Sequence, residues 1–303
     1  MLAIWAALIP VFLLISSGYG LKYIKFPGDD LWPPLERLVY FVLFPSLLCG
    51  NLATADLEGF RVGPVTLAIV GSLGLMSLLM VVLRKHFGGG PALTSVFQGT
   101  VRFNSYVGLA IAGELWSTAG TALAAVVVAI MVPASNAFSV LALARFSGAN
   151  PPRIRRVLLL MVQNPLILAC LLGVLLNISG LGLPPVIGPV IEIFGRAALP
   201  IGLMCVGAGL ELGAIRDAGR VVTETMLIRL IGMPVIMATM CSLFDVTGLT
   251  AKVAILMAAL PTASSSFILA RQLGGDVVLM ASIITISTLA AMLTMPILLP
   301  LLW

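Results

Sequence analysis

Four residues able to hold a ligand stand inside one apolar stretch, VFQGTVRFNSYVGLAIAGEL: Arg102, Asn104, Ser105 and Gly108. The amide of Asn104 both donates and accepts hydrogen bonds, so it can hold freed backbone groups and still bind a carboxylate. An ionisable side chain within a membrane span is a functional candidate, and Arg102 could pair with a substrate carboxylate. The alternative, equally open, is that Arg102 extends toward the cytoplasmic face from near the start of its span.

A second apolar stretch, AILMAALPTASSSFILARQL, contains a proline followed by hydroxyl residues. Pro261 lacks a backbone N–H and so interrupts helical hydrogen bonding. Thr262, Ser264 and Ser265 follow, without a His or strong carboxylate at a spacing that would activate them as nucleophiles. The sequence also lacks a phosphate-binding loop, a metal-ligand cluster and a catalytic triad. We therefore predict neither an enzyme nor a nucleotide-driven pump, and no cofactor.

The composition indicates the kind of element that carries these residues. Of 303 residues, 60% are hydrophobic and 10% are charged, whereas soluble domains have about 45–50% and about 25%. So little charge cannot cover a surface exposed to water. The net charge of +5 comes largely from short loops between apolar spans, which indicates topology signals rather than a nucleic-acid surface. We predict an all-α integral membrane protein in contact with lipid, with no nucleic-acid partner.

Apolar windows long enough to cross a bilayer, about 20 residues each, recur along the whole chain. Clusters of Gly, Pro and charged residues separate them, and they predict about ten transmembrane helices. The windows lie at roughly 3–24, 33–54, 62–83, 92–114, 119–143, 156–178, 186–210, 220–243, 249–271 and 277–302.

Lysine and arginine are distributed unequally between alternate loops. After the even-numbered spans there are only Arg61 and Lys252. Because cytoplasmic loops are enriched in basic residues, this asymmetry predicts that the odd loops are cytoplasmic. Both termini then lie on the outer side of the cytoplasmic (inner) membrane. The basic residues at the odd loops are Lys22, Lys25, Arg37, Arg84, Lys85, Arg145, Arg153, Arg155, Arg156, Arg216, Arg220 and Arg271.

The two halves of the chain correspond in the order and length of their spans. Pro10 and Pro165 are 155 residues apart, and so are Pro45 and Pro200. Because five spans is an odd number, the second copy must enter the membrane in the opposite direction. That is the inverted-repeat architecture of many secondary transporters. The predicted units are a first repeat over 1–145, a cytoplasmic linker over 146–155 and a second repeat over 156–303.

The two polar stretches lie in the fourth and ninth predicted spans, which are corresponding positions of the two halves. Non-helical backbone at membrane depth survives only when it is buried in protein or faces water, so the pair indicates one shared cavity. A helix that restarts inside the membrane directs the partial positive charge of its N-terminus there, which favours an anionic ligand. The alternative is that the prolines and hydroxyl residues only serve helix packing.

These residues also carry a resemblance to a known family. The chain resembles the auxin efflux carrier family, which includes plant auxin exporters and bacterial permeases for malate-like and malonate-like acids. The resemblance covers essentially the full length. Its motifs are FNSYVGLAI at 103–111, VPASN at 132–136, and LPTASSSFILARQLGGD at 260–276 followed by ISTLAAMLTMP.

The resemblance implies the fold of the bile-acid, auxin and arsenite transporters. In that fold, helices one, two, six and seven form a scaffold. The third to fifth and eighth to tenth helices form a mobile transport domain in which the fourth and ninth cross. Asn104 and Pro261 then lie at the two breaks, and Asn136 lies beside the site on the fifth helix. Ala110 stands where many members have proline, so the first break would depend on Asn104 and Gly108.

The expected function is that of a secondary transporter that carries small organic anions by alternating access with an elevator-like motion. Such a fold could form a homodimer through its scaffold helices. One alternative is a sodium- or proton-coupled carrier of the bile-acid transporter type. Those carriers concentrate carboxylates near the crossing, whereas the polar residues here are mainly neutral. The other alternative is a membrane sensor that transports nothing.

Two pairs of opposite charge lie in the later spans. Glu192 and Arg196 are four residues apart in the seventh span and can neutralise each other. A buried structural pair is favoured there over an ion-coupling site. The same interpretation applies to Glu224 and Arg229 in the eighth span.

Overall fold

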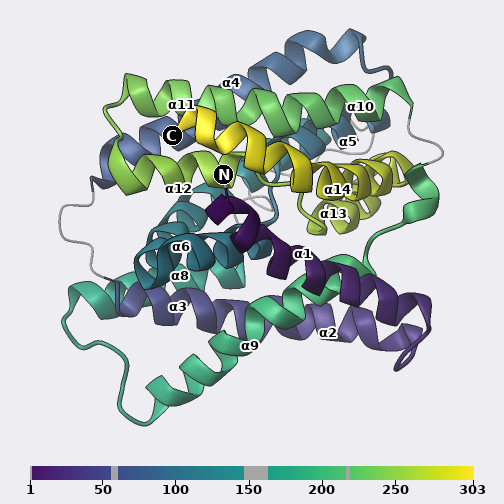
Figure 1. Cartoon of the computed structure of the whole chain (residues 1–303). Coiled ribbons are helices and arrows are strands. Elements are labelled where there is room, and N and C mark those ends of the chain that lie inside the picture. Colours follow the sequence, from purple (N-terminus) through teal and green to yellow (C-terminus); the bar gives the residue numbers. More distant parts are fainter. Residues whose placement is uncertain (1, 56–60, 147–162, 216–218) are drawn as a thin grey trace.

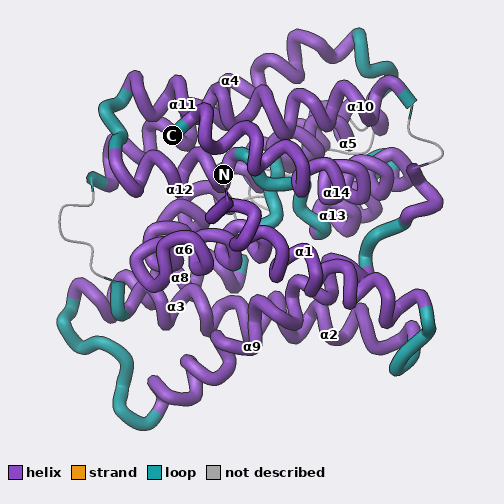
Figure 2. Tube along the Cα trace, viewed as in Figure 1, coloured by secondary structure: helices purple, strands orange, loops and turns teal. Residues whose placement is uncertain are grey.

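The computed structural model describes residues 2–55, 61–146, 163–215 and 219–303 (Figure 1). The structure is 84% helical, and the described ranges contain no strand (Figure 2). Helices dominate because a backbone in lipid can satisfy its N–H and C=O groups only within its own segment. The prediction of an all-α protein is confirmed. Most of the predicted linker, with Arg153 and Arg155, lies outside the described residues, as does Arg216.

Thirteen α-helices fall within the described ranges, joined by short 3-10 and π-helical turns. The α-helices are α1 (Leu2–Tyr23), α2 (Trp32–Leu38), α3 (Phe44–Ala53), α4 (Val62–Val82), α5 (Gly90–Val101), α6 (Ser105–Phe146), α8 (Pro165–Ile178), α9 (Ile187–Ala208), α10 (Arg220–Leu227), α11 (Met233–Leu243), α12 (Gly248–Ala258), α13 (Ser265–Leu273) and α14 (Val277–Leu302). The 3-10 turns are η1 (Asp29–Leu31), η3 (Leu83–Lys85) and η4 (Leu212–Ile215), and the π-helical turns are η2 (Val39–Leu43) and η5 (Ile228–Gly232).

Seven helical stretches of the described chain are long and apolar enough to cross a membrane. One of them, Gly90–Phe146, contains both α5 and α6 and is 57 residues long, far more than the about 20 residues that one crossing needs. Two shorter apolar helices, α8 and α12, are additional to these seven. The chain is therefore a multi-pass membrane protein.

A kink divides α6 close to the boundary predicted between the fourth and fifth spans. The backbone leaves helical geometry at Trp116 (φ −135°, ψ 16°) and Ser117 (φ 54°, ψ −140°). The chain packs tightly around this turn, because a Cβ at Gly120 would overlap the carbonyl of Ala112. The kink therefore separates 105–115 from 118–146.

The helices form two packed groups with α6 between them (Figure 1). In the first group, α3 packs against α8 and α9, α1 packs against α9, and α2 also lies against α9. Glycine permits the closest approach. A Cβ at Gly207 would meet the carbonyl of Ile15, and a Cβ at Gly18 would meet the carbonyl of Met204. Small residues of this kind let membrane helices pack backbone to backbone.

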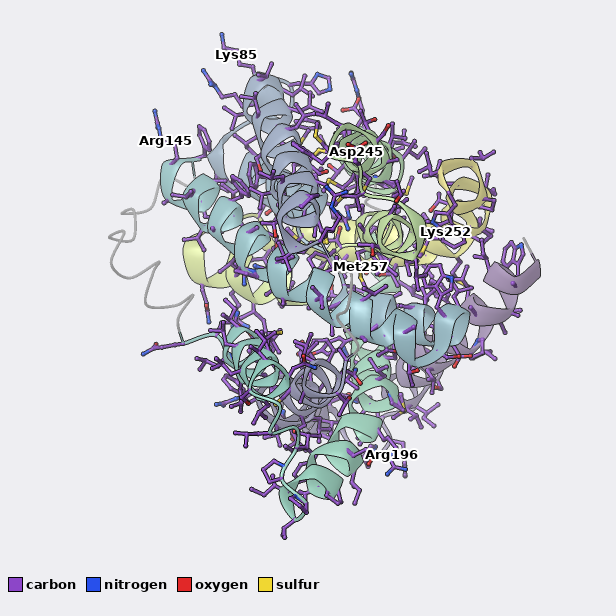
Figure 3. The ribbon with its side chains drawn as sticks, turned by 90° about the vertical axis from the view of Figure 1, so that its left-hand side faces the viewer. Lys85, Arg145, Arg196, Asp245, Lys252 and Met257 are labelled. Carbon is purple, nitrogen blue, oxygen red and sulfur yellow. The ribbon has the colours of Figure 1, made fainter. Side chains whose placement is uncertain are left out.

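The second group contains α4, α5 and α10 to α14 and holds much of the buried core. On α12, every side chain from Val253 to Ala258 is buried. Met257 of that run lies inside the molecule in Figure 3. Outer faces of several helices are apolar, as at Leu13, Leu78 and Ile193, each about 60% exposed. Such faces suit hydrocarbon rather than water.

The connections between successive helices fall into two sets according to which helix ends contact each other. In the first set, the end of α1 contacts the end of α9, the turn after α4 contacts α10, and the loop after α13 contacts the start of α5. Lys85, in η3 after α4, and Arg145, near the end of α6, project from the body of the molecule in Figure 3. The contacts of this set join Lys22 Nζ to the Ala208 carbonyl (2.7 Å), His86 Nε2 to Glu224 Oε2 (2.7 Å), and the Asp276 N–H to the Pro91 carbonyl (3.1 Å).

The second set consists of two groups of contacts, one between the ends of α3 and α8 and one around the C-terminus. Asn177 donates from Nδ2 to the carbonyls of Ala53 and Ala55, at 3.3 and 2.8 Å. The rings of Trp116 and Trp303 lie 5.3 Å apart, and Lys252 Nζ lies 5.7 Å from the Trp303 ring. The contacts thus link alternate connections of the chain to one another.

Candidate functional site

Two membrane-spanning segments are interrupted where the sequence places its polar stretches. Helix α5 ends at Val101, and α6 begins at Ser105 after three non-helical residues. Arg102 has extended geometry there (φ −85°, ψ 145°). Helix α12 ends at Ala258, and α13 begins at Ser265. The first interruption forms without a proline.

The two interruptions meet through Asn104. Its N–H donates to the carbonyl of Pro261 at 3.0 Å, so backbone freed at one break is satisfied by the other. Its Oδ1 accepts from the N–H of Val107 at 3.4 Å, and its carbonyl accepts from Gly108 at 3.2 Å, which starts α6. Asn104 Nδ2 is buried and has no partner among the described residues. This amide therefore keeps a free donor for a ligand.

Arg102 ties three segments together at the same place. Its Nη1 donates to Asn136 Oδ1 at 2.7 Å, and its Nη2 donates to Ser265 Oγ at 2.9 Å. The guanidinium therefore points into the junction of the two breaks and the later half of α6, and not toward a membrane face. Within the described part of the chain, no carboxylate lies within 4.0 Å of it. Its charge remains available to an anion.

A cavity of about 680 Å³ opens at this junction, between the two groups of helices. Six of the predicted site residues line it: Arg102, Asn104, Ser105, Asn136, Ser264 and Ser265. Ser264 Oγ, like Asn104 Nδ2, is buried without a described partner. Ser105 and Ser265 are the first residues of α6 and α13, so two helix N-termini border the cavity. Helix N-termini stabilise negative charge.

Three predicted site residues do not line the cavity and instead pack or bond at the two helix breaks. A Cβ at Gly108 would stand 2.5 Å from atoms of Leu260 and Met257, so glycine permits close packing of α6 against the second break. Thr262 donates from Oγ1 to the Gly99 carbonyl at 2.7 Å. The third, Pro261, supplies the carbonyl that Asn104 uses.

The opposite wall comes from the first group of helices and was not predicted from the sequence. Glu36, Arg37 and Tyr40 line the cavity from α2 and η2, and Cys205 lines it from α9. The spacing of Glu36 and Tyr40, one helical turn apart, was a signal that these side chains share a face. Tyr40 also lies in the π-helical turn η2, and such turns occur frequently at functional sites.

Two expectations about charged pairs are wrong. Glu224 does not pair with Arg229. It accepts from Arg220 Nε at 2.5 Å and lies 2.7 Å from His86. Glu192 and Arg196 do pair, at 3.4 Å, but their side chains are 66% and 71% exposed rather than buried. Figure 3 shows Arg196 at the outer side of α9. A spacing of about four residues places two side chains on one side of a helix, but it could not tell whether that side faces inward or outward.

Taken together, a multi-pass helical bundle with a polar cavity at two interrupted helices defines a membrane transport protein. A family model described as membrane transport protein matches residues 3–299, so the chain belongs to that family. The resemblance to the auxin efflux carrier family is thereby confirmed. An uncharacterized transporter of Methanothermobacter thermautotrophicus is 26% identical to this chain over 293 residues, which are 94% of each protein.

Proposed function

We propose that this protein is a secondary transporter that moves small organic anions, carboxylates in particular, across the cytoplasmic membrane by alternating access. The observation that carries the proposal is the cavity where the two interrupted helices meet. Arg102 presents a guanidinium there without a described carboxylate partner, and α6 and α13 start at its border. Guanidinium and carboxylate match in charge and geometry.

The architecture behind the proposal is a pair of inverted five-helix repeats. The first is 1–145 and the second is 156–303. Interruptions in corresponding segments support this, because transporters of this design place their binding site between two broken helices. Contacts that link alternate connections to one another support ten crossings. The excess of Lys and Arg in the odd-numbered loops supports an orientation with both termini outside.

Transport follows from relative movement of the two helix groups. The scaffold is α1, α2, α3, α8 and α9, which glycine contacts hold tightly together. The rest of the chain carries Arg102 and Asn104 and moves as the transport domain in an elevator-like motion. The position of the cavity between the two groups supports this division, because displacement of one group moves the bound anion past the fixed wall.

A proton-coupled symporter is a second candidate, favoured by one observation. Glu36 lines the same cavity as Arg102. The carboxylate of a bound substrate and the carboxyl group of Glu36 would resist simultaneous ionisation in a half-buried space. A bound anion would therefore favour the protonated form of Glu36. A proton would then cross the membrane with the anion if the Glu36 carboxyl group faces the bound anion throughout the transport cycle.

Purified protein in liposomes tests the proposal. Uptake of dicarboxylates and aromatic carboxylates is measured with no gradient, a sodium gradient or a proton gradient. Saturable uptake of an organic anion without either gradient supports the first candidate, and a requirement for a proton gradient supports the second. Binding without uptake in any arm indicates a sensor, and neutral solutes carried in preference to anions contradict both transport candidates.

A further inference from the structure

One arginine of the second helix group has no part in the cavity yet touches both interrupted helices. Arg229 lies in the π-helical turn η5, and its side chain is completely buried. Its Nε donates to the carbonyl of Leu260 at 2.9 Å, and its Nη1 donates to the carbonyl of Thr100 at 3.1 Å. One guanidinium thus bonds to a residue in the last turn of α5 and to a residue just beyond the end of α12.

Both carbonyls lack a helical partner because of the breaks. In a continuous helix the Thr100 carbonyl would accept from the N–H of Asn104, four residues on. That N–H donates to Pro261 instead. Leu260 lies beyond the end of α12, in the non-helical run before α13. Carbonyls at the C-terminal ends of helices attract positive charge, and unsatisfied ones are costly in hydrocarbon.

Close packing brings the arginine within reach of both. A Cβ at Gly99 would stand 2.8 Å from Ile283 and 3.0 Å from Thr225. The small residue therefore lets α5 approach α10 and α14 closely. Arg229 follows Thr225 by four residues, one turn along the same segment. Among the described residues no carboxylate lies within ion-pair distance of Arg229, so its contacts here are with backbone rather than with a counterion.

We propose that Arg229 is a positioning residue that ties the two interrupted helices together and so fixes the anion site. Thr100 precedes Arg102 by two residues, and Leu260 precedes the proline whose carbonyl holds Asn104. A shift of either carbonyl moves a cavity-lining residue. This inference rests on the proposed function. The planar fork suits the task because it reaches two acceptors at once, whereas a lysine is a point donor.

Two variants and one control test the inference. Arg229→Met removes both bonds and the charge, and Arg229→Lys keeps the charge but cannot span both carbonyls. Arg196→Met is the matched control, because it removes an exposed arginine on α9. Amide hydrogen exchange is measured for the peptide containing Asn104 and for peptides of α1 and α9. Anion uptake by the same preparations gives the half-saturating concentration and the maximal rate.

For Arg229→Met we expect about tenfold faster exchange in the peptide containing Asn104 and unchanged exchange in the peptides of α1 and α9. We also expect at least a tenfold higher half-saturating concentration for anion uptake. Arg229→Lys should lie between it and wild type, and Arg196→Met should match wild type. Wild-type exchange at Asn104 in Arg229→Met would overturn the inference, as would equal loss of protection in all helices. If wild-type protein carries no organic anion, the proposed function fails, and the exchange result still decides the role of Arg229.

Discussion

At the scale of single residues, the site depends on groups that hold one another in place. Arg102 is oriented by two acceptors from different helices, Asn136 and Ser265. A guanidinium fixed in this way loses little conformational freedom when it binds a carboxylate. Asn104 has separate roles for its backbone and its side chain, since its N–H bonds to the Pro261 carbonyl, whereas Nδ2 has no partner in the described part of the chain.

Asn104→Ala separates these two roles. The backbone bond to Pro261 survives, and the loss of the Oδ1 cap of α6 costs about 0.5–2 kcal/mol of stability. We expect the variant to insert and purify as a monodisperse species but to lose anion binding. Calorimetric titration in detergent measures the binding, and size-exclusion chromatography checks the fold. Wild-type affinity in the variant would mean that the amide serves packing alone.

Ser265→Ala removes one of the two acceptors that orient Arg102. A hydrogen bond to a charged group contributes about 1.5–3 kcal/mol, so we expect the anion dissociation constant to rise by about tenfold or more. Ser46→Ala is a suitable control, because that hydroxyl bonds to Val42 within its own segment. Equal affinities for the two variants would show that the guanidinium needs no support from α13.

At the scale of elements, the breaks were predictable and their supports were not. Asn104, Pro261 and the run of serines stand out against apolar sequence, so local chemistry located both interruptions. The bonds from Arg229 and the wall containing Glu36 depend on segments far apart in the chain. An arginine in a span has the same local signature whether it pairs with a carboxylate, reaches water or binds carbonyls. Three-dimensional packing alone distinguishes these cases.

Ser117 stores strain at the kink of α6. Its φ of 54° lies in the region that side chains avoid and glycine adopts freely. Backbone strain of this kind costs about 1–3 kcal/mol, so Ser117→Gly should raise the thermal stability of the purified protein, whereas Ser117→Ala should not. A lower melting temperature for the glycine variant than for the alanine variant would contradict this account of the kink.

Two glycines of α1 provide a matched test of the scaffold. A Cβ at Gly18 would overlap the Met204 carbonyl, whereas nothing lies within 4 Å of one at Gly20. Overpacking costs about 1–3 kcal/mol, while alanine in an open helical position is about 1 kcal/mol better than glycine. Gly18→Ala should therefore melt below wild type and Gly20→Ala at or above it. Equal melting temperatures would show that α1 and α9 are not tightly held.

At the scale of the whole molecule, successive connections are expected on opposite sides of the membrane, which makes the orientation of the chain testable. Lys85 lies in η3, between α4 and α5, whereas Lys252 lies near the start of α12, 5.7 Å from the ring of the C-terminal Trp303. In a background without the four native cysteines, Lys252→Cys should react with an impermeant reagent added to intact cells. Lys85→Cys should react only after permeabilisation. The reverse pattern would invert the proposed orientation.

The central claim is that the cavity at the two breaks binds an anion during transport. Solute counterflow in liposomes tests it most directly, comparing wild type with Arg102→Gln and with the exposed control Arg196→Gln. The account predicts saturable exchange of an organic anion by wild type and control, and exchange reduced at least tenfold in Arg102→Gln at equal protein incorporation. Exchange at the wild-type rate by Arg102→Gln would contradict it, because the anion would then cross the membrane without the guanidinium at the crossing.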